Sequence, residues 1–114
     1  MQKDDPIVDL HYLKKYTNGD KDLLQELIDA FKETAEEGLQ DLKNSVDTDD
    51  PAMWKNAAHK LKGSAGYVGA EVLKALCSQA QNMEHITHAQ RKEFFERIIT
   101  SYEDVSRLLQ EGEV

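Results

Sequence analysis

One histidine carries the chemistry that this sequence can perform most directly. His59 lies in the run AHKLKGSAGYVGA, which spans residues 58–70. Residues three and four apart share a face of a helix, so a helical His59 lies beside Lys55, Lys62 and Gly63. An exposed imidazole is largely unprotonated at neutral pH and offers a ring-nitrogen lone pair to an electrophile. The lysines would stabilise a phosphoryl group, which brings negative charge and acceptor oxygens.

Two glycines of this run lie on the same helical face as His59. Gly63 and Gly66 follow it by four and seven residues, and a glycine inside a helix costs about 1 kcal/mol relative to alanine. Apolar residues at spacings of three and four form a different face: Trp54, Ala58, Leu61, Ala65 and Val68. Bare helix surface beside an accessible imidazole suits close approach by another macromolecule. An ordinary surface histidine among scattered lysines is the alternative, and the two glycines argue against it.

Helix-start signals divide the chain into helical segments. Asp5 and Asp50 each precede a proline, and Asp20 follows an Asn-Gly pair; aspartate is favoured at the N-cap and proline at the first helical position. Gly69 is a plausible left-handed stop. The predicted helices run from about 6 to 16, 21 to 46, 52 to 67, 72 to a point between 85 and 88, and through 94 to 109.

These segments also predict the fold class. Apolar residues recur at spacings of three and four, and strand-like alternation is missing. Short connections between amphipathic helices favour antiparallel neighbours. We therefore expect an all-α protein, an antiparallel up-and-down four-helix bundle with a short additional N-terminal helix. We also expect residues 1–114 to form a single domain with a polar C-terminal tail from about residue 110.

Composition limits the range of partners. The chain has 22 acidic and 14 basic residues and a formal net charge of −8, which argues against nucleic acid and anionic membrane surfaces. Cys77 is the single cysteine and cannot form an internal disulfide. We expect Cys77 to be a small core residue. With no signal-peptide or membrane-spanning segment in the sequence, we expect a cytoplasmic monomer.

The residues around the histidine resemble a known family. The segment His59-Lys60-Leu61-Lys62-Gly63-Ser64, closed by Gly69-Ala70, is similar to the signature of histidine-containing phosphotransfer (HPt) domains. The likeness extends over essentially the whole chain, through Asp9-Leu10, Tyr12-Leu13, Gly19-Asp20 and Ala57-Ala58. The resemblance implies a helical bundle that relays a phosphoryl group between aspartates of receiver domains in two-component phosphorelays.

The resemblance also implies a role for each matching residue. His59 would be the phosphoacceptor, Lys62 would contact the phosphoryl group, and Gly63 would leave room for the receiver loop. Gln81 follows His59 by 22 residues and stands where family members often have a glutamine that orients the imidazole. A polar residue flanking the apolar stripe is an equally open interpretation of Gln81.

Lys55 and Gly66 are further candidate docking residues. Lys55 follows from helical geometry alone, and Gly66 falls where the family accepts several small residues. The expected partners are receiver domains and a hybrid sensor kinase. Since the sequence has no glycine-rich nucleotide loop, we expect a phosphocarrier without autokinase activity. It would need no cofactor and bind no metal, because Mg²⁺ in this family belongs to the receiver.

Two rival interpretations stay open. The first is a docking adaptor that binds receiver or kinase domains without carrying phosphate; it would keep the glycines and have no need of the histidine. The second is a metal site at His85 and His88, although a surface loop is favoured because Glu84 is the only nearby carboxylate. His11 is expected to be a partly buried packing residue.

Overall fold

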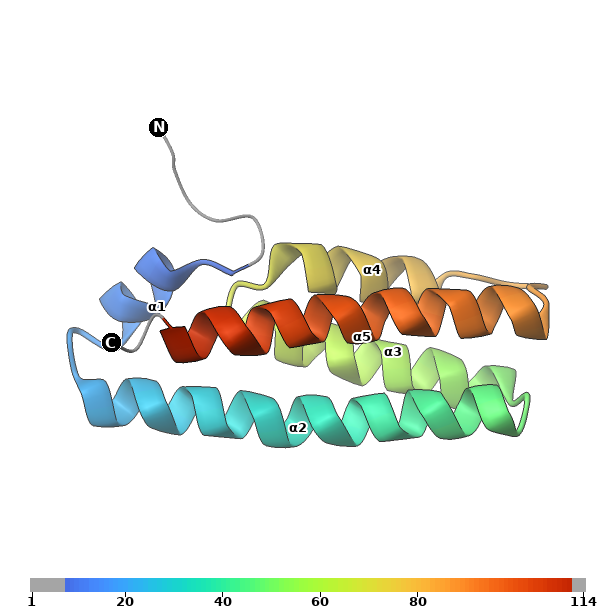
Figure 1. Cartoon of the computed structure of the whole chain (residues 1–114), viewed down its shortest axis with the longest axis horizontal. Coiled ribbons are helices and arrows are strands. Elements are labelled where there is room, and N and C mark those ends of the chain that lie inside the picture. Colours follow the sequence, from blue (N-terminus) through green and yellow to red (C-terminus); the bar gives the residue numbers. More distant parts are fainter. Residues whose placement is uncertain (1–7, 112–114) are drawn as a thin grey trace.

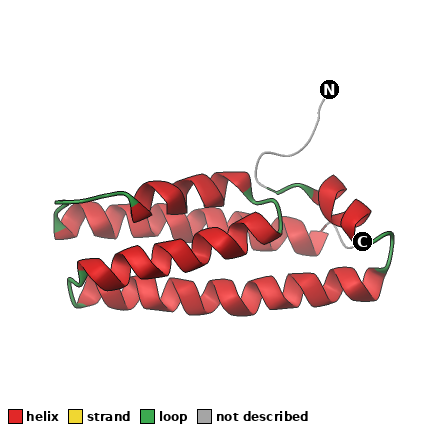
Figure 2. Ribbon diagram, turned by 180° about the vertical axis from the view of Figure 1, so that it is seen from behind, coloured by secondary structure: helices red, strands yellow, loops and turns green. Residues whose placement is uncertain are grey.

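The computed structural model describes residues 8–111, which form five helices and no strand (Figures 1 and 2). They are α1 (Leu10–Tyr16), α2 (Lys21–Asp47), α3 (Pro51–Tyr67), α4 (Glu71–Gln81) and α5 (His88–Glu111). Helices α2 to α5 lie alongside one another, each running opposite to the one before it, and α1 lies at one end of the bundle (Figure 1). The predicted up-and-down four-helix bundle with a short leading helix is confirmed.

Apolar stripes from all four long helices meet in one core. The fully buried large side chains include Ile28, Leu42, Trp54, Leu61, Leu73, Ile98 and Leu109. Helices α2 and α3 approach closely, because a Cβ placed on Gly38 would lie only 3.4 Å from the Cβ of Leu61. This contact presses one face of α3 into the bundle. The opposite face of α3, which carries His59, is therefore held rigidly toward solvent.

The predicted starts of the two central helices are confirmed. The Asp20 carboxylate accepts a hydrogen bond from the Leu23 amide at 3.0 Å, and the Asp50 carboxylate accepts one from the Met53 amide at 3.1 Å. Each bond satisfies a backbone donor that a helix start leaves unpaired. Gly69 adopts a φ of +68°, as predicted for a left-handed stop after α3.

The predicted start of the first helix is wrong. Val8 and Asp9 are not helical, and Asp9 is the N-cap, accepting a hydrogen bond from the Tyr12 amide at 2.8 Å. The cause is tertiary: Val8 is fully buried, and the Asp9 amide donates to the Gly69 carbonyl oxygen at 3.2 Å. Asp5, the expected cap, lies outside the described residues.

The connection between α4 and α5 is longer than expected. Helix α4 ends at Gln81, before the predicted end between residues 85 and 88, and residues 82–87 are not helical. Helix α5 then starts with a reciprocal pair of hydrogen bonds. The Thr87 amide donates to Gln90 Oε1 at 2.8 Å, and the Gln90 amide donates to Thr87 Oγ1 at 3.1 Å. This capping box fixes where α5 begins.

Two side-chain predictions have opposite outcomes. His11 is exposed, so the expected packing role is wrong. Helix α1 turns Leu13 to the core, and residues two apart on a helix point in different directions. Cys77 is fully buried on α4, as predicted, and burial raises the pKa of its thiol to about 12.

Gly69 allows a direct stability test of the contact between α1 and the α3–α4 turn. A Cβ at this position would lie 2.9 Å from the Cβ of Asp9, in addition to the strain of a positive φ. We expect Gly69→Ala to lower the free energy of unfolding by about 2 kcal/mol or more, measured by urea denaturation. Gly19→Ala is the matched control, because Gly19 has a φ of +77° and open space around it. Equal losses of stability in the two variants would show that the close contact with Asp9 does not lower the free energy of unfolding.

Candidate functional site

The middle of α3 presents His59 to solvent. The flanking residues Ala58 and Leu61 are fully buried, whereas His59 itself is exposed. Core contacts on both sides therefore fix the backbone at His59 while leaving the imidazole accessible. The backbone at this position therefore loses little further conformational freedom when a partner aligns with the ring.

Lysine side chains surround His59 on the same helix. Lys55 is exposed and Lys62 is half-buried, and neither forms an ion pair with another residue in the described part of the chain. Lys60, by contrast, points elsewhere and lies 3.7 Å from the Asp41 carboxylate. The positive charges of Lys55 and Lys62 are therefore available to an anionic group at His59.

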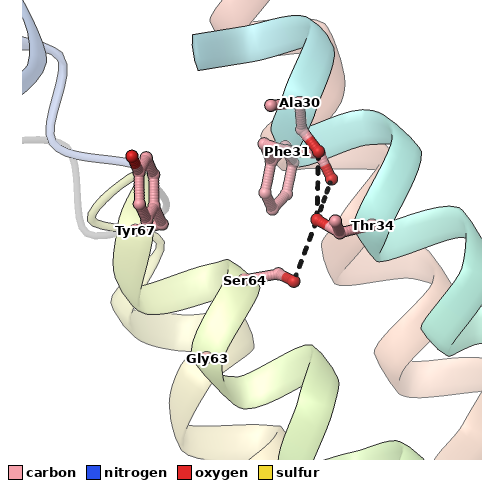
Figure 3. A pocket seen from close by; sticks show the side chains of 6 residues that line it. All are labelled: Ala30, Phe31, Thr34, Gly63, Ser64 and Tyr67. Carbon is pink, nitrogen blue, oxygen red and sulfur yellow. Dashed lines mark hydrogen bonds between the residues drawn. The ribbon is translucent and has the colours of Figure 1, made fainter.

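A hollow opens one helical turn beyond His59, between α2 and α3 (Figure 3). We call it the Gly63 hollow; its volume is about 400 Å³, and it is lined by Ala30, Phe31, Thr34, Gly63, Ser64 and Tyr67. Phe31 and Tyr67 lie on opposite sides of it (Figure 3). The Phe31 ring is almost completely buried, whereas Tyr67 is 59% exposed. The hollow thus offers apolar surface to a partner that approaches His59.

A hydrogen-bonded pair of hydroxyl groups lies at the edge of the Gly63 hollow. Ser64 Oγ donates to Thr34 Oγ1 at 3.1 Å, and Thr34 Oγ1 is also within 3.0 Å of the Ala30 carbonyl oxygen (Figure 3). Ser64 Oγ is also 3.4 Å from the Lys60 carbonyl oxygen, one helical turn earlier on α3. The pair ties α3 to α2 at the position where the glycine leaves the surface bare.

The two glycines of the motif have different surroundings. A Cβ on Gly63 would have no atom within 4 Å, so this side of α3 is open. A Cβ on Gly66 would lie 3.7 Å from Cδ of Lys74, and Gly66 is half-buried. Of the two, Gly63 is therefore the one that gives a partner direct access to the helix backbone.

Gln81 ends α4 beside the turn of α3 that precedes His59. Trp54 Nε1 donates to the Ala80 carbonyl oxygen at 2.9 Å and so fixes the end of α4 against α3. Gln81 Oε1 is buried and has no hydrogen-bond partner among the described residues, and the structure shows no hydrogen bond between Gln81 and His59. Orientation of the imidazole by Gln81 stays a prediction.

Three residues of this surface were not assigned a role from the sequence. Phe31 fits the core stripe of its helix, Thr34 follows it on the same face, and Tyr67 lies in a stretch to which no function was attached. Their proximity arises only when α2 packs against α3. One sequence feature could have indicated this surface: Tyr67 follows Gly63 by four residues, a spacing that places both on one face of a helix.

The rival metal site gains no further ligands. His85 lies in the 82–87 connection and His88 begins α5, and both are exposed. Among residues 8–111, no three histidine, cysteine or acidic side chains are grouped so that they could hold a metal ion. Over the same range, no helix is both long and apolar enough to cross a membrane.

The chain is similar to at least two known proteins. One is the phosphorelay intermediate protein rdeA of Dictyostelium discoideum, 26% identical over 102 residues; the match covers 89% of this chain but only 40% of rdeA. The other is the crystal structure of histidine-containing phosphotransfer protein B (HptB) from Pseudomonas aeruginosa PAO1. It is 20% identical, has a TM-score of 0.78 and matches over 95% of each chain. At this identity the second likeness shows the fold alone.

The match to a family model is the decisive comparison. Residues 26–111 match the model of the Hpt domain. This range contains most of α2 and all of α3, α4 and α5, and so includes His59 and the Gly63 hollow. The resemblance seen in the motif is confirmed: the chain belongs to the Hpt domain family, the phosphotransfer domains of two-component phosphorelays.

Proposed function

We propose that this chain is a phosphocarrier in which His59 accepts a phosphoryl group from the phospho-aspartate of one receiver domain and passes it to the aspartate of another. The observation that carries the proposal is the exposed imidazole at the centre of a rigid helix, next to the open surface at Gly63. A partner loop can approach this histidine without displacing any side chain of α3.

The transfer itself needs few groups on this chain. A ring nitrogen of His59 attacks phosphorus, the nitrogen–phosphorus bond forms, and the phosphorus–oxygen bond to the partner's aspartate breaks. The carboxylate leaves on the opposite side, and the next receiver reverses the sequence. Positioning and charge stabilisation supply most of the acceleration in such a step. We assign charge stabilisation to Lys62, with Lys55 as an auxiliary cation.

Docking places the receiver over the Gly63 hollow. An apolar side chain of the receiver would enter between Phe31 and Tyr67, while the receiver loop that carries the aspartate would cross Gly63. Such a small contact area suits a weak, transient complex, as a carrier that must exchange partners requires.

The remaining chemistry belongs to the partners. The ATP-dependent step is assigned to a hybrid sensor kinase, and the Mg²⁺ that the transfer requires is assigned to the acidic pocket of the receiver. The chain would act as a monomer in the cytoplasm, without a cofactor of its own. Gln81 is proposed to orient the imidazole, because its Oε1 is buried without a donor near the turn that precedes His59.

Lys62 provides a test of the electrostatic part of this mechanism. We expect Lys62→Ala to slow transfer from a phosphorylated cognate receiver by about ten- to hundredfold, because one charged group that stabilises the transferred phosphoryl group is lost. Rapid-quench measurement of the transfer rate checks this. Lys60→Ala is the control on the same helix, since Lys60 faces Asp41. Equal transfer rates for the two variants would show that Lys62 does not stabilise the transferred phosphoryl group.

The function as a whole is tested by a two-step transfer. A panel of receiver domains carrying radiolabelled phospho-aspartate is mixed with the chain, and the labelled chain is then mixed with unlabelled receivers. We expect label to appear on the chain and then to leave it for a second receiver. Receivers that bind the chain without ever labelling it would instead support the docking adaptor.

A further inference from the structure

The side chain of Lys74, which belongs to α4, lies across α3 at Gly66. Its Cδ and Cε would be 3.7 and 3.8 Å from a Cβ placed on this glycine. These are ordinary van der Waals distances, so alanine at position 66 would just touch the lysine stem, whereas a longer side chain would displace it. The ammonium group, one bond beyond Cε, therefore lies beside Gly66. The glycine leaves the space that the stem of Lys74 fills.

The charge of Lys74 is available to a partner. Lys74 is exposed, and its ammonium group forms no ion pair with another residue in the range 8–111. Glu71, three residues earlier, is the acidic residue of α4, and the two side chains are not paired. A lysine often packs its stem on apolar surface while its charged group stays in water. Packing on Gly66 thus restricts where the charge lies without neutralising it.

Apolar surface and the Lys74 charge lie on opposite sides of the α3 face that carries His59. Helix α3 packs between α2 and α4 (Figure 2). On the side of α2, the Gly63 hollow offers the side chains of Phe31 and Tyr67. On the side of α4, the stem of Lys74 covers the helix. A receiver that docks on this face would therefore meet apolar surface on one side and a positive charge on the other.

Distance assigns Lys74 to docking and not to charge stabilisation of the phosphoryl group. Gly66 follows His59 by seven residues, which corresponds to about 10 Å along the helix axis. Between exposed charges, interactions are largely screened beyond about 8 Å at physiological ionic strength. Lys62 remains the cation close to the phosphoryl group. A protein interface extends well beyond 10 Å from its centre, so Lys74 lies where the rim of a docked receiver would be.

We propose that Lys74 is a specificity-determining docking residue, which pairs with an acidic side chain on the part of the receiver that faces α4. This rests on the proposed function, because it requires the receiver to dock over His59. Apolar contact at the Gly63 hollow and the charge pair at Lys74 would hold the receiver at two points on either side of His59 and so fix its orientation. A receiver with a basic side chain opposite Lys74 would be rejected by charge repulsion.

Receiver binding tests the proposal without requiring phosphoryl transfer. Calorimetric titration uses the unphosphorylated receiver domain that binds the chain most tightly. Lys74→Met keeps an unbranched stem over Gly66 and removes the charge, and should weaken binding about threefold; Lys74→Glu should weaken it about tenfold. Lys74→Arg should bind as the original chain does. The losses should shrink at high salt, because screening weakens the charge pair.

Lys92→Glu is the matched control. It changes the net charge by the same amount as Lys74→Glu, and Lys92 is an exposed residue of α5 that lines a hollow between α2 and α5. Its receiver affinity should be unchanged. Equal affinities of the original chain, Lys74→Met and Lys74→Glu would overturn the proposal. Equal losses in Lys74→Glu and Lys92→Glu would also overturn it, because net charge alone would then explain the effect.

Exchanging the charges tests the pair itself. The acidic side chains that surround the aspartate pocket of the receiver are replaced by lysine one at a time, and the pocket is left intact. One of these receivers should bind Lys74→Glu about as tightly as the original receiver binds the original chain. Recovery of affinity with none of them would overturn the proposal.

The transfer assay separates this proposal from the proposed function. At saturating receiver, Lys74→Glu should accept label as fast as the original chain, because Lys74 contributes to affinity alone. A lower rate at saturation would overturn the docking role. If no chain accepts label but the affinity differences at Lys74 persist, the proposed function fails and the Lys74 contact is supported.

Discussion

Replacing His59 with glutamine is expected to abolish phosphoryl transfer to the chain while leaving its stability within about 0.5 kcal/mol of the original value. The imidazole is exposed, and the neighbouring core residues are held by contacts that do not involve it. Glutamine is a good helix former, so α3 should be unaffected. It has no ring nitrogen to attack phosphorus, so the first step cannot occur.

The chemical nature of the label identifies the acceptor. A phosphoryl group on an imidazole nitrogen is labile in acid and stable in alkali, unlike a serine or threonine ester. We expect label with these properties on the original chain and none above background on His59→Gln, after incubation with a phosphorylated receiver. Urea denaturation of both proteins, monitored by circular dichroism, checks that the fold is intact.

An equally exposed histidine provides the control. His11 lies on α1, is open to solvent and has Lys14 and Lys15 three and four residues further along, but α1 contains no glycine. His11→Gln should therefore be labelled as fast as the original chain. Persistent acid-labile label on His59→Gln would show that another histidine accepts the phosphoryl group. Loss of label in both variants would indicate indirect damage to the docking surface.

Local signals explain why most of the fold could be predicted. Asp20 and Asp50 act as N-caps, and Gly69 takes the left-handed conformation that ends α3. Each of these features depends on a side chain and a backbone group only a few residues apart. The exposure of His59 was likewise predictable, because α3 carries its apolar residues on a different face.

Other features depend on contacts between distant segments, and these could not be predicted. Helix α1 starts late because Asp9 binds the Gly69 carbonyl oxygen, far along the chain. The Gly63 hollow exists because the packing of α2 beside α3 places Phe31 and Tyr67 on opposite sides of one space. Burial of unpartnered atoms in Arg91 and Gln81 is also a tertiary property. The start of α5, by contrast, could have been predicted, because the Thr87–Gln90 capping box is a local sequence pattern.

Gly63→Leu is expected to stabilise the fold and block transfer at the same time. Nothing lies within 4 Å of a Cβ at this position, and Gly63 is exposed within α3. Leucine should therefore raise the free energy of unfolding by about 0.5–1 kcal/mol through its higher helix propensity. The same side chain would stand where the receiver loop must cross the helix, and misplacing the reacting groups by about 1 Å can lower the rate about a hundredfold.

Two measurements separate these effects. Urea denaturation gives the gain in stability, and calorimetric titration with a cognate receiver gives the loss of affinity. Ala75→Leu is the matched control, because Ala75 is an exposed helical residue on α4, a helix that contributes no lining residue to the Gly63 hollow. It should bind receivers and accept phosphate normally. Unchanged receiver affinity in Gly63→Leu would show that the bare backbone is not what admits the partner.

The two variants together distinguish a phosphocarrier from a docking adaptor. An adaptor would lose receiver binding in Gly63→Leu but would be indifferent to His59→Gln, since it needs the surface and not the nucleophile. A phosphocarrier loses its activity in both, and only Gly63→Leu also loses affinity. Gly63 weakens its own helix, and the best explanation is a partner that must approach there. The gain in the free energy of unfolding on replacing Gly63 measures how much stability the glycine costs the fold.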